Sequence, residues 1–295
     1  MDYVSTKEYA SAHGLAERTV RNYCVQGKIA GARLVGKSWS LPADAPLPAR
    51  KNASPTVSPL LRALREQKEA RMKGGIYHRT QIDLTYNSNH MEGSRLTKEQ
   101  TRYIFETRTV GATDTALRVD DIIETTNHFR CVDLIIDQAQ EPLTESLIKQ
   151  LHRTLRTATS DAALPWFAVG DYKRLPNEVG GQETTPPEEV RKAMGELLRD
   201  YRAKRSVGLD DILDFHKRFE AIHPFQDGNG RVGRLIMFKE CLAHGIVPFI
   251  VTDDLKMFYY RGLQHWPRVP GYLRDTCLTA QDNYKALLNY FRIEY

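Results

Sequence analysis

Five prolines crowd one short stretch near the N-terminus, and no other feature of the sequence limits the fold as strongly. They stand at positions 42, 46, 48, 55 and 59. Proline fixes its own φ and has no backbone N–H to donate, so neither a helix nor a central strand can run through this stretch. We therefore expect an extended linker at residues 43–58, between a small unit at 1–42 and a large unit at 59–295 of the 295-residue chain.

Positive charge gathers in the small unit. Residues 1–52 contain eight Lys and Arg against four Asp and Glu, so they carry +4 of the formal net charge of +5. The remaining chain is close to neutral. A basic segment on a neutral body indicates a part of the protein that faces nucleic acid.

Within the small unit, glycines separate short segments of regular pattern. We expect a helix at 7–13 capped by Thr6, a second helix at 16–26 and a two-stranded wing over residues 29–41. This order predicts a winged helix-turn-helix. The segments 17–23 and 35–39 resemble excisionase/MerR-like DNA-binding domains, which implies a DNA surface formed by the basic residues Arg18, Arg21, Lys28 and Lys37. A small adapter that binds protein is the alternative.

The large unit has the apolar spacing of helices almost throughout. We expect helices at 60–73, 81–91, 97–105, 120–138, 144–157, 187–204, 210–222, 231–244, 253–265 and 272–291. The pair Gly180-Gly181 between short polar-apolar runs predicts a β-hairpin at 172–185. The fold class expected for this unit is therefore all-α, a helical bundle with one hairpin.

Composition places the chain among ordinary soluble proteins, with 41% hydrophobic and 27% charged residues. No run approaches the roughly 18 apolar residues of a membrane span, and the N-terminus lacks the pattern of a signal peptide. The four scattered cysteines include no CxxC pair, which favours reduced thiols over a zinc site. These features predict a cytoplasmic protein without a membrane partner.

The side chains suited to catalysis and phosphate binding lie in the segment His223–Arg234, between two expected helices. Its centre, Asp227-Gly-Asn-Gly230, frees the backbone dihedrals and removes side-chain bulk just before a helix begins. A loop of this kind presents several N–H donors together with the positive end of the helix dipole. The sequence therefore predicts an anion site suited to phosphates.

Each side chain around this loop is suited to one role in a nucleotide site. Arg231 and Arg234 are three apart and share a helix face, from which both can reach phosphate oxygens. Asp227 is an oxygen ligand suited to Mg²⁺, and Asn229 can donate to phosphate. His223 can be neutral at cellular pH and accept the proton of an attacking hydroxyl. Taken singly each feature is commonplace, and their combination over twelve residues carries the prediction.

This segment resembles the motif HPFx[DE]GNGRxxR of the Fic/Doc family at every specified position. The resemblance covers about residues 59–291 and implies an enzyme that transfers AMP from ATP to Ser, Thr or Tyr of a target protein. It implies that His223 is the general base and Asp227 the metal ligand. It further implies that Phe225 anchors the loop and that the nucleotide phosphates are held by Gly228, Asn229, Gly230, Arg231 and Arg234.

Two further segments take a role from the same resemblance. The hairpin at 172–185 is similar to the family's flap, which pairs with the target backbone, and an ordinary surface hairpin is the alternative. Tyr259 and Tyr260 stand where family members line the adenine pocket, and core packing is the alternative for both.

An inhibitory motif, [ST]xxxE[GN], is matched by Ser88, Glu92 and Gly93, in the helix expected at about 81–92. Ser88 and Glu92 are four apart and therefore lie on one helix face. A glutamate delivered to the phosphate site would pair with Arg234 and repel the triphosphate. The resemblance thus implies a self-inhibited adenylyltransferase, and Glu92 is also a candidate for removal of AMP from modified targets.

Three functions remain open from the sequence. The first is the self-inhibited adenylyltransferase. The second is a DNA-binding regulator whose helical body only senses nucleotide, and the third is an enzyme of the same fold with another nucleotide donor. The target protein, the DNA site and whether the chain forms a homodimer lie beyond the sequence.

Overall fold

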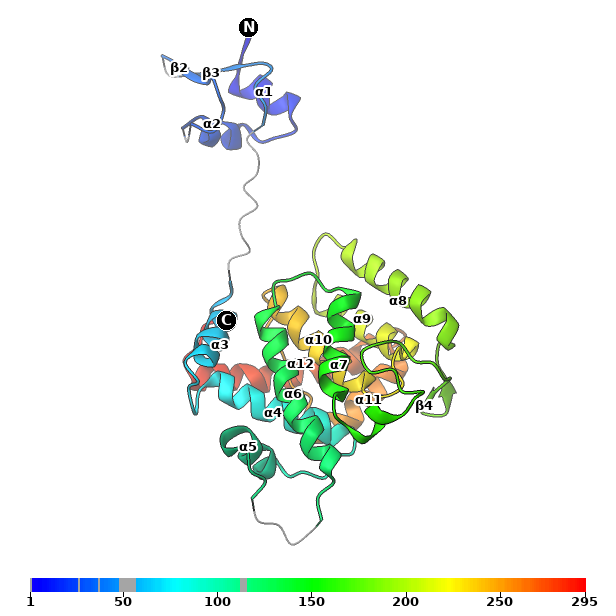
Figure 1. The fold of residues 1–295 in the computed structure, drawn as a ribbon. Coiled ribbons are helices and arrows are strands. Elements are labelled where there is room, and N and C mark those ends of the chain that lie inside the picture. Colours follow the sequence, from blue (N-terminus) through cyan, green and yellow to red (C-terminus); the bar gives the residue numbers. More distant parts are fainter. Residues whose placement is uncertain (1, 26, 37, 48–56, 112–115) are drawn as a thin grey trace. The chain divides into compact units, whose positions relative to one another are not determined.

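The computed structural model describes residues 2–25, 27–36, 38–47, 57–111 and 116–295. They form two compact units, Met1–Thr56 and Val57–Tyr295. Figure 1 shows the helices and strands of each unit.

The first unit consists of two helices and a three-stranded antiparallel sheet. Its elements are β1 (Tyr3–Ser5), α1 (Thr6–Ala12), α2 (Glu17–Val25), β2 (Arg33–Val35) and β3 (Ser38–Pro42), and the strand order is β1-β3-β2. Tyr9, Val20 and Leu41 are at most 1% exposed and form the centre of its small core.

This unit differs from the sequence-based expectation in three details. The N-cap of α1 is Ser5 rather than Thr6, because the Ser5 side chain accepts from the N–H of Glu8 and the Glu8 carboxylate accepts in return. The expected two-stranded wing gains β1 as a third strand. Ala45, which was expected in the linker, is buried in this unit, and its carbonyl accepts from the hydroxyl of Tyr9 at 2.7 Å.

The second unit is a helical body, as expected. Its elements are α3 (Pro59–Glu69), α4 (Ile76–Met91), α5 (Lys98–Thr107), α6 (Val119–Asp137), α7 (Glu145–Arg156), η1 (Ser160–Ala163), β4 (Glu178–Val179), β5 (Gln182–Glu183), α8 (Pro187–Arg202), α9 (Leu209–Ile222), α10 (Asn229–Ala243), η2 (Asp253–Leu255), α11 (Lys256–His265) and α12 (Pro270–Tyr290). The hairpin prediction is confirmed by the antiparallel pairing of β4 with β5. The capping box at Thr97 and Gln100 is also confirmed.

Some boundaries in this body differ from those expected. Helix α4 begins at Ile76, five residues before the expected start, because Gly75 lies at its N-cap in an extended conformation. Helix α10 begins at Asn229 rather than Arg231. The segment expected as one helix at 253–265 is divided into η2 and α11.

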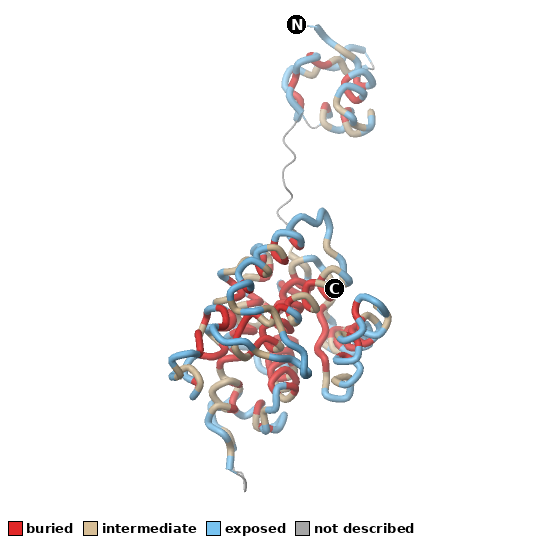
Figure 2. The backbone as a smooth tube through the Cα atoms, turned by 90° about the vertical axis from the view of Figure 1, so that its right-hand side faces the viewer, coloured by how far each residue is buried: buried red, intermediate tan, exposed pale blue. Residues whose placement is uncertain are grey.

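Helix α10 runs through the middle of the helical body, in contact with α9, α6, α7 and α4 (Figure 1). Buried positions gather in the interior of the helical body, whereas its outer segments are largely exposed (Figure 2). Charged side chains of α10 are buried too, among them Arg231, Arg234 and Lys239. Because a buried charge is costly unless it is paired, each of them needs a partner. Arg231 and Arg234 pair with residues outside the helix, whereas Lys239 pairs with Glu240 of α10 itself. Within the described ranges, no helix is both long and apolar enough to cross a membrane.

Candidate active site

Helix α9 ends at the first residue of the chemical segment. Pro224 cannot continue the helix, because it has no N–H to donate. His223 caps the helix in the left-handed region, at φ 50° and ψ 61°, and its N–H donates to the carbonyl of Phe219 at 2.9 Å. This conformation costs a non-glycine residue about 1–2 kcal/mol, so the surrounding contacts must hold it.

Those contacts begin with Phe225, which is fully buried. The side chain of Asn229 closes the loop over it. Its Oδ1 accepts from the N–H of Phe225 and its Nδ2 donates to the carbonyl of the same residue, each at 2.8 Å. The sequence assigned Asn229 to phosphate, whereas here its amide is bonded to the loop itself. It therefore fixes the shape of the anion site.

The loop then enters α10 through Gly228, which lies at φ 83°. A side chain would be strained at this φ. The first N–H groups of a helix have no acceptor within it, so the N–H groups of Asn229, Gly230 and Arg231 are available to an anion. At Gly230, a Cβ would lie 2.3 Å from Glu92 Oε1, so glycine lets the Glu92 carboxylate approach the loop.

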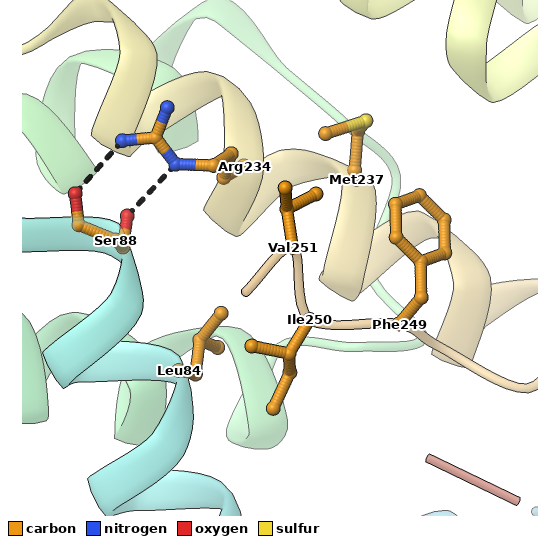
Figure 3. A pocket seen from close by; sticks show the side chains of 7 residues that line it. All are labelled: Leu84, Ser88, Arg234, Met237, Phe249, Ile250 and Val251. Carbon is orange, nitrogen blue, oxygen red and sulfur yellow. Dashed lines mark hydrogen bonds between the residues drawn. The ribbon is translucent and has the colours of Figure 1, made fainter. Parts of the chain in front are cut away.

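Arg234 binds the end of α4. Its Nε donates to Ser88 Oγ at 3.0 Å, and its Nη2 donates to the Ser88 carbonyl at 3.0 Å and to Glu92 Oε1 at 2.6 Å. Figure 3 shows Ser88 and Arg234 facing each other beside a small cavity of about 10 Å³, with the apolar side chains of Leu84, Met237, Phe249, Ile250 and Val251 behind them. Because Gly93 follows at φ 93°, the chain turns away directly after Glu92. The three inhibitory residues predicted from sequence thus lie at the anion loop.

Arg231 points to other carboxylates. Its guanidinium contacts Asp227 Oδ2 at 3.1 Å and the carboxylate of Glu124, from α6. Arg156, at the end of α7, contacts the same two carboxylates and also Asp161. These residues border a polar cleft of about 150 Å³, which also reaches Glu92.

Arg156 and Glu124 were not identified from the sequence. Arg156 is 2% exposed and lies within 2.9 Å of Asp227, so the anion site has a third buried arginine. No local pattern marks either residue, because α6 and α7 reach the loop only through the packing of the body. An arginine at the end of an amphipathic helix ordinarily lies on a solvated face.

Asp227 is half exposed at the mouth of this cleft. Burial alone would raise its pKa, but Arg231 and Arg156 together lower it, so the group is a carboxylate at neutral pH. Among the described residues, no group of three or more His, Cys, Asp or Glu side chains is arranged to hold a metal. One carboxylate beside a phosphate site fits Mg²⁺, which is commonly bound by one or two carboxylates together with substrate phosphates.

His223 is partly buried, with 17% of its side chain exposed. Its Nδ1 lies 3.4 Å from the Glu220 carbonyl and 4.0 Å from the Glu220 carboxylate. Burial lowers the pKa of His223, so the imidazole is neutral at cellular pH. Burial raises the pKa of Glu220 to about 7.

The hairpin is joined to this loop at its base. Lys173 Nζ donates to Asn177 Oδ1 at 2.6 Å, to Thr184 Oγ1 at 2.5 Å and to the Ile222 carbonyl at 3.4 Å. Asn177 Nδ2 donates to the Phe225 carbonyl at 3.0 Å. These bonds hold the base of the hairpin next to His223.

The two tyrosines assigned to an adenine pocket have different environments. Tyr259 is 1% exposed, packs in an apolar cluster and has its hydroxyl against His216 Nε2, so it belongs to the core. Tyr260 is 39% exposed and is open to a ligand.

The predicted DNA residues lie in the first unit. Arg18, Arg21 and Lys28 are exposed, and Arg21 pairs with Glu17 at 3.1 Å. Lys37 lies outside the described residues.

Comparison with known proteins identifies related sequences. Residues 142–241 match the model of the Fic/DOC family. The protein adenylyltransferase Fic of Nematostella vectensis is 28% identical over 182 residues, which are 60% of this chain and 41% of that protein. The protein adenylyltransferase Fic of Drosophila persimilis is 27% identical over 228 residues, 74% of this chain and 41% of that protein. The chain therefore spans about two fifths of the length of these curated relatives.

Solved structures share the fold. A Fic domain containing signaling protein from Bacteroides thetaiotaomicron VPI-5482 is 26% identical with a TM-score of 0.59, over 78% of this chain and 90% of that chain. Fic-1 (residues 134–508) from C. elegans has a TM-score of 0.60 at 18% identity, over 79% of this chain and 72% of that chain, a likeness of fold alone. The helical body thus has the fold of Fic proteins.

Proposed function

We propose that this Fic/Doc family protein is a protein adenylyltransferase that transfers AMP from ATP to a Ser, Thr or Tyr hydroxyl and is held inactive by Glu92. One observation carries the proposal. The loop before α10 brings together the neutral imidazole of His223, the carboxylate of Asp227 and buried arginines. One of these arginines, Arg234, is paired with the carboxylate of Glu92.

In this reaction the target hydroxyl forms a bond to the α-phosphorus, and the bond from that phosphorus to the bridging oxygen breaks to release pyrophosphate. His223 takes the hydroxyl proton. Its Nδ1 faces the Glu220 carbonyl, which leaves Nε2 free as the base. The lowered pKa of His223 keeps Nε2 unprotonated at neutral pH.

The remaining groups of the site bind the nucleotide. Asp227 would hold Mg²⁺ together with phosphate oxygens, and the ion would screen the charge of the leaving pyrophosphate. The N–H groups at the start of α10 and the guanidinium of Arg234 bind the other phosphate oxygens. Tyr260 is the residue available to the adenine ring.

Glu92 is the brake in this proposal, because its carboxylate uses the same guanidinium that the triphosphate needs. Its oxygen lies 2.6 Å from Arg234 Nη2, and it also stands where a Cβ of residue 230 would be. A bound triphosphate would have to displace this carboxylate or bind beside it against charge repulsion.

The test uses ATP labelled at the α-phosphate. We expect Glu92→Gly to raise labelling of itself and of a band in a host lysate by on the order of 10- to 100-fold, the range of ordinary coupling energies. The matched control is the double variant with His223→Ala, in which labelling returns to background. If Glu92→Gly labels no more than the parent protein while binding ATP, the brake is wrongly assigned.

The target protein docks, in this proposal, at the hairpin. The strands β4 and β5 are exposed, so a target segment can add to their edge through backbone hydrogen bonds that tolerate many sequences. The identity of the target and the modified side chain are to be read from mass spectrometry of the labelled lysate band.

Glu92 also suggests the reverse activity. A carboxylate at the phosphate site can orient a water toward an AMP-modified side chain. Incubation of a modified target with the parent protein and with Glu92→Gly tests this, since removal predicts that the label persists only with the variant. Equal persistence of the label with both proteins contradicts it.

Two alternatives keep the fold and change the function. A body that only senses nucleotide would bind ATP and transfer nothing in the labelling experiment. An enzyme with another donor would transfer label from a different nucleotide, because the loop contacts phosphates rather than bases. A panel of α-labelled nucleotides with the Glu92→Gly protein distinguishes these outcomes.

DNA binding is a second function proposed for the first unit. Two helices, an antiparallel hairpin and the exposed basic residues Arg18, Arg21 and Lys28 support it. We expect a gel shift with DNA that weakens as salt rises, because phosphate contacts release counterions. A shift that is absent at low salt would contradict the proposal and favour a protein-binding adapter.

A further inference from the structure

His152, from α7, lies directly beneath the anion loop. It is fully buried, and its ring is stacked parallel to that of Phe225, with centroids 4.0 Å apart and 3° between the planes. Its Nδ1 accepts from the N–H of Gly170 at 2.9 Å, and its Nε2 lies 3.1 Å from the Asp227 carbonyl. One side chain therefore joins α7, the segment before the hairpin and the loop.

The contacts determine the tautomer of this ring. A backbone N–H can only donate, so Nδ1 must be unprotonated to accept from Gly170. In a neutral imidazole the proton is then on Nε2, which donates it to the Asp227 carbonyl.

His152 is the residue of another helix that bonds this peptide, whose Gly228 N–H also bonds the Asp227 carboxylate. The two bonds of Asn229 fix the backbone of Phe225, two residues earlier. The Asp227 carbonyl belongs to the peptide that links Asp227 to Gly228, and it accepts from His152 Nε2. Helix α7 also packs closely against Gly228. A Cβ at this position would lie 3.3 Å from Leu155 Cδ2 and 3.7 Å from His152 Cδ2.

We propose that His152 is a positioning residue of the nucleotide site, whose imidazole fixes the peptide between Asp227 and Gly228. Rotation of that peptide would turn the Asp227 carboxylate and the first N–H groups of α10 away from the nucleotide phosphates. The inference rests on the proposed function, since it assigns His152 a role in holding the substrate of that reaction.

Two substitutions separate the two hydrogen bonds of the ring. In His152→Gln the amide nitrogen takes the place of Nε2 and keeps the donor to Asp227. In His152→Asn the amide oxygen takes the place of Nδ1 and keeps only the acceptor for Gly170. In the Glu92→Gly background, we expect Asn to lower kcat/KM for ATP by about 10- to 100-fold and Gln to restore most of it.

His128 provides a matched control. It is also fully buried, burial together with nearby Arg231 and Arg234 lowers its pKa to about 3, and its Nδ1 is bonded to Thr85 at 2.9 Å rather than to the loop. His128→Asn should lower the melting temperature without changing kcat/KM for ATP. If it reduces kcat/KM as much as His152→Asn, the effect reports general loss of stability and the proposal is overturned.

A second readout does not depend on catalysis. Without nucleotide, amide hydrogen exchange over residues 225–231 should be faster in His152→Asn than in the parent protein, and close to the parent rate in His152→Gln. Equal exchange in both variants overturns the proposal. If Glu92→Gly transfers no AMP, the proposed function fails, whereas the exchange rates still decide whether His152 positions the loop.

Discussion

In the loop between α9 and α10, Phe225 is fully buried and both of its backbone polar groups are bonded to Asn229. In the neighbouring β4–β5 hairpin, every strand residue is exposed and two residue pairs make up the ladder. The two regions adjoin through Lys173 and Asn177, which bond the base of the hairpin to the loop. Apart from this shared base, the loop is buried and bonded by a side chain, whereas the strands are exposed and joined by a short backbone ladder.

The difference follows from the work proposed for each region. Phosphate-binding groups must stay within about 0.5 Å of their working positions, so the loop is fixed by packing and by side chain–backbone bonds. An edge that pairs with the backbone of a target gains from free N–H and C=O groups. We therefore expect substitutions in the loop to change the rate of AMP transfer strongly and substitutions in the hairpin to change target binding weakly.

The largest effect is expected at Asn229. Substitution by Ala leaves the buried N–H of Phe225 without this acceptor, which costs about 1–3 kcal/mol in the free energy of unfolding. With the loop loosened, AMP transfer in the Glu92→Gly background should fall about 100-fold. Urea unfolding and α-phosphate labelling measure the two effects. Transfer that stays near the parent rate would show that the loop keeps its shape without this side chain.

The pH dependence of activity tests the assignment of His223 as the general base. The base acts when deprotonated, and burial lowers the pKa of His223. Activity should therefore be complete above the ordinary histidine pKa of about 6.5 and fall about tenfold per pH unit below a midpoint more acidic than that. A kcat/KM profile of Glu92→Gly from acid to neutral pH gives the midpoint, and a midpoint above that value contradicts the assignment.

A smaller effect is expected at the base of the hairpin. Lys173→Met removes three donors, but Asn177 and Thr184 can still bond each other. We expect the KM for the labelled target to rise about tenfold, within the 1–1.5 kcal/mol of an ordinary hydrogen bond, with KM for ATP unchanged. Arg174→Met, at the exposed neighbour, is the control. A change in KM for ATP instead would place Lys173 with the nucleotide.

The smallest effect is expected within the strands. Val179 is 44% exposed, and its substitution by Ala should change stability by no more than about 0.5 kcal/mol. Transfer to the target should also change little, because the pairing uses the backbone. A tenfold loss of target labelling would mean that the hairpin binds the target through its own side chains. The contrast with the loop would then be weaker.

Local sequence pattern accounts for the part of the site that is local. The segment His223–Arg234 joins α9 to α10, as expected, although its residues from Asn229 onward already belong to α10. Its glycines stand where the chain needs positive φ or close approach. The hairpin and most helices were also predicted, because apolar spacing and paired glycines mark them. Helix α4 was predicted to start too late, since Gly75 does not have the side chain of a usual N-cap.

Long-range contacts account for what the sequence did not reveal. His152, Arg156 and Glu124 lie far from the loop in sequence and reach it only because α6 and α7 pack on α10. Tyr259 was assigned to a ligand pocket with Tyr260, although neighbours on a helix point in different directions. Its burial against His216 is decided by the packing of α11.

The most direct measurement of the central claim compares two labels of ATP. The Glu92→Gly protein is incubated with ATP labelled at the α-phosphate or at the γ-phosphate, and protein-bound label is counted in each case. Transfer of AMP predicts that label from the α-position is retained and that label from the γ-position is lost with pyrophosphate. Label retained from the γ-position, or from neither position, would contradict the account.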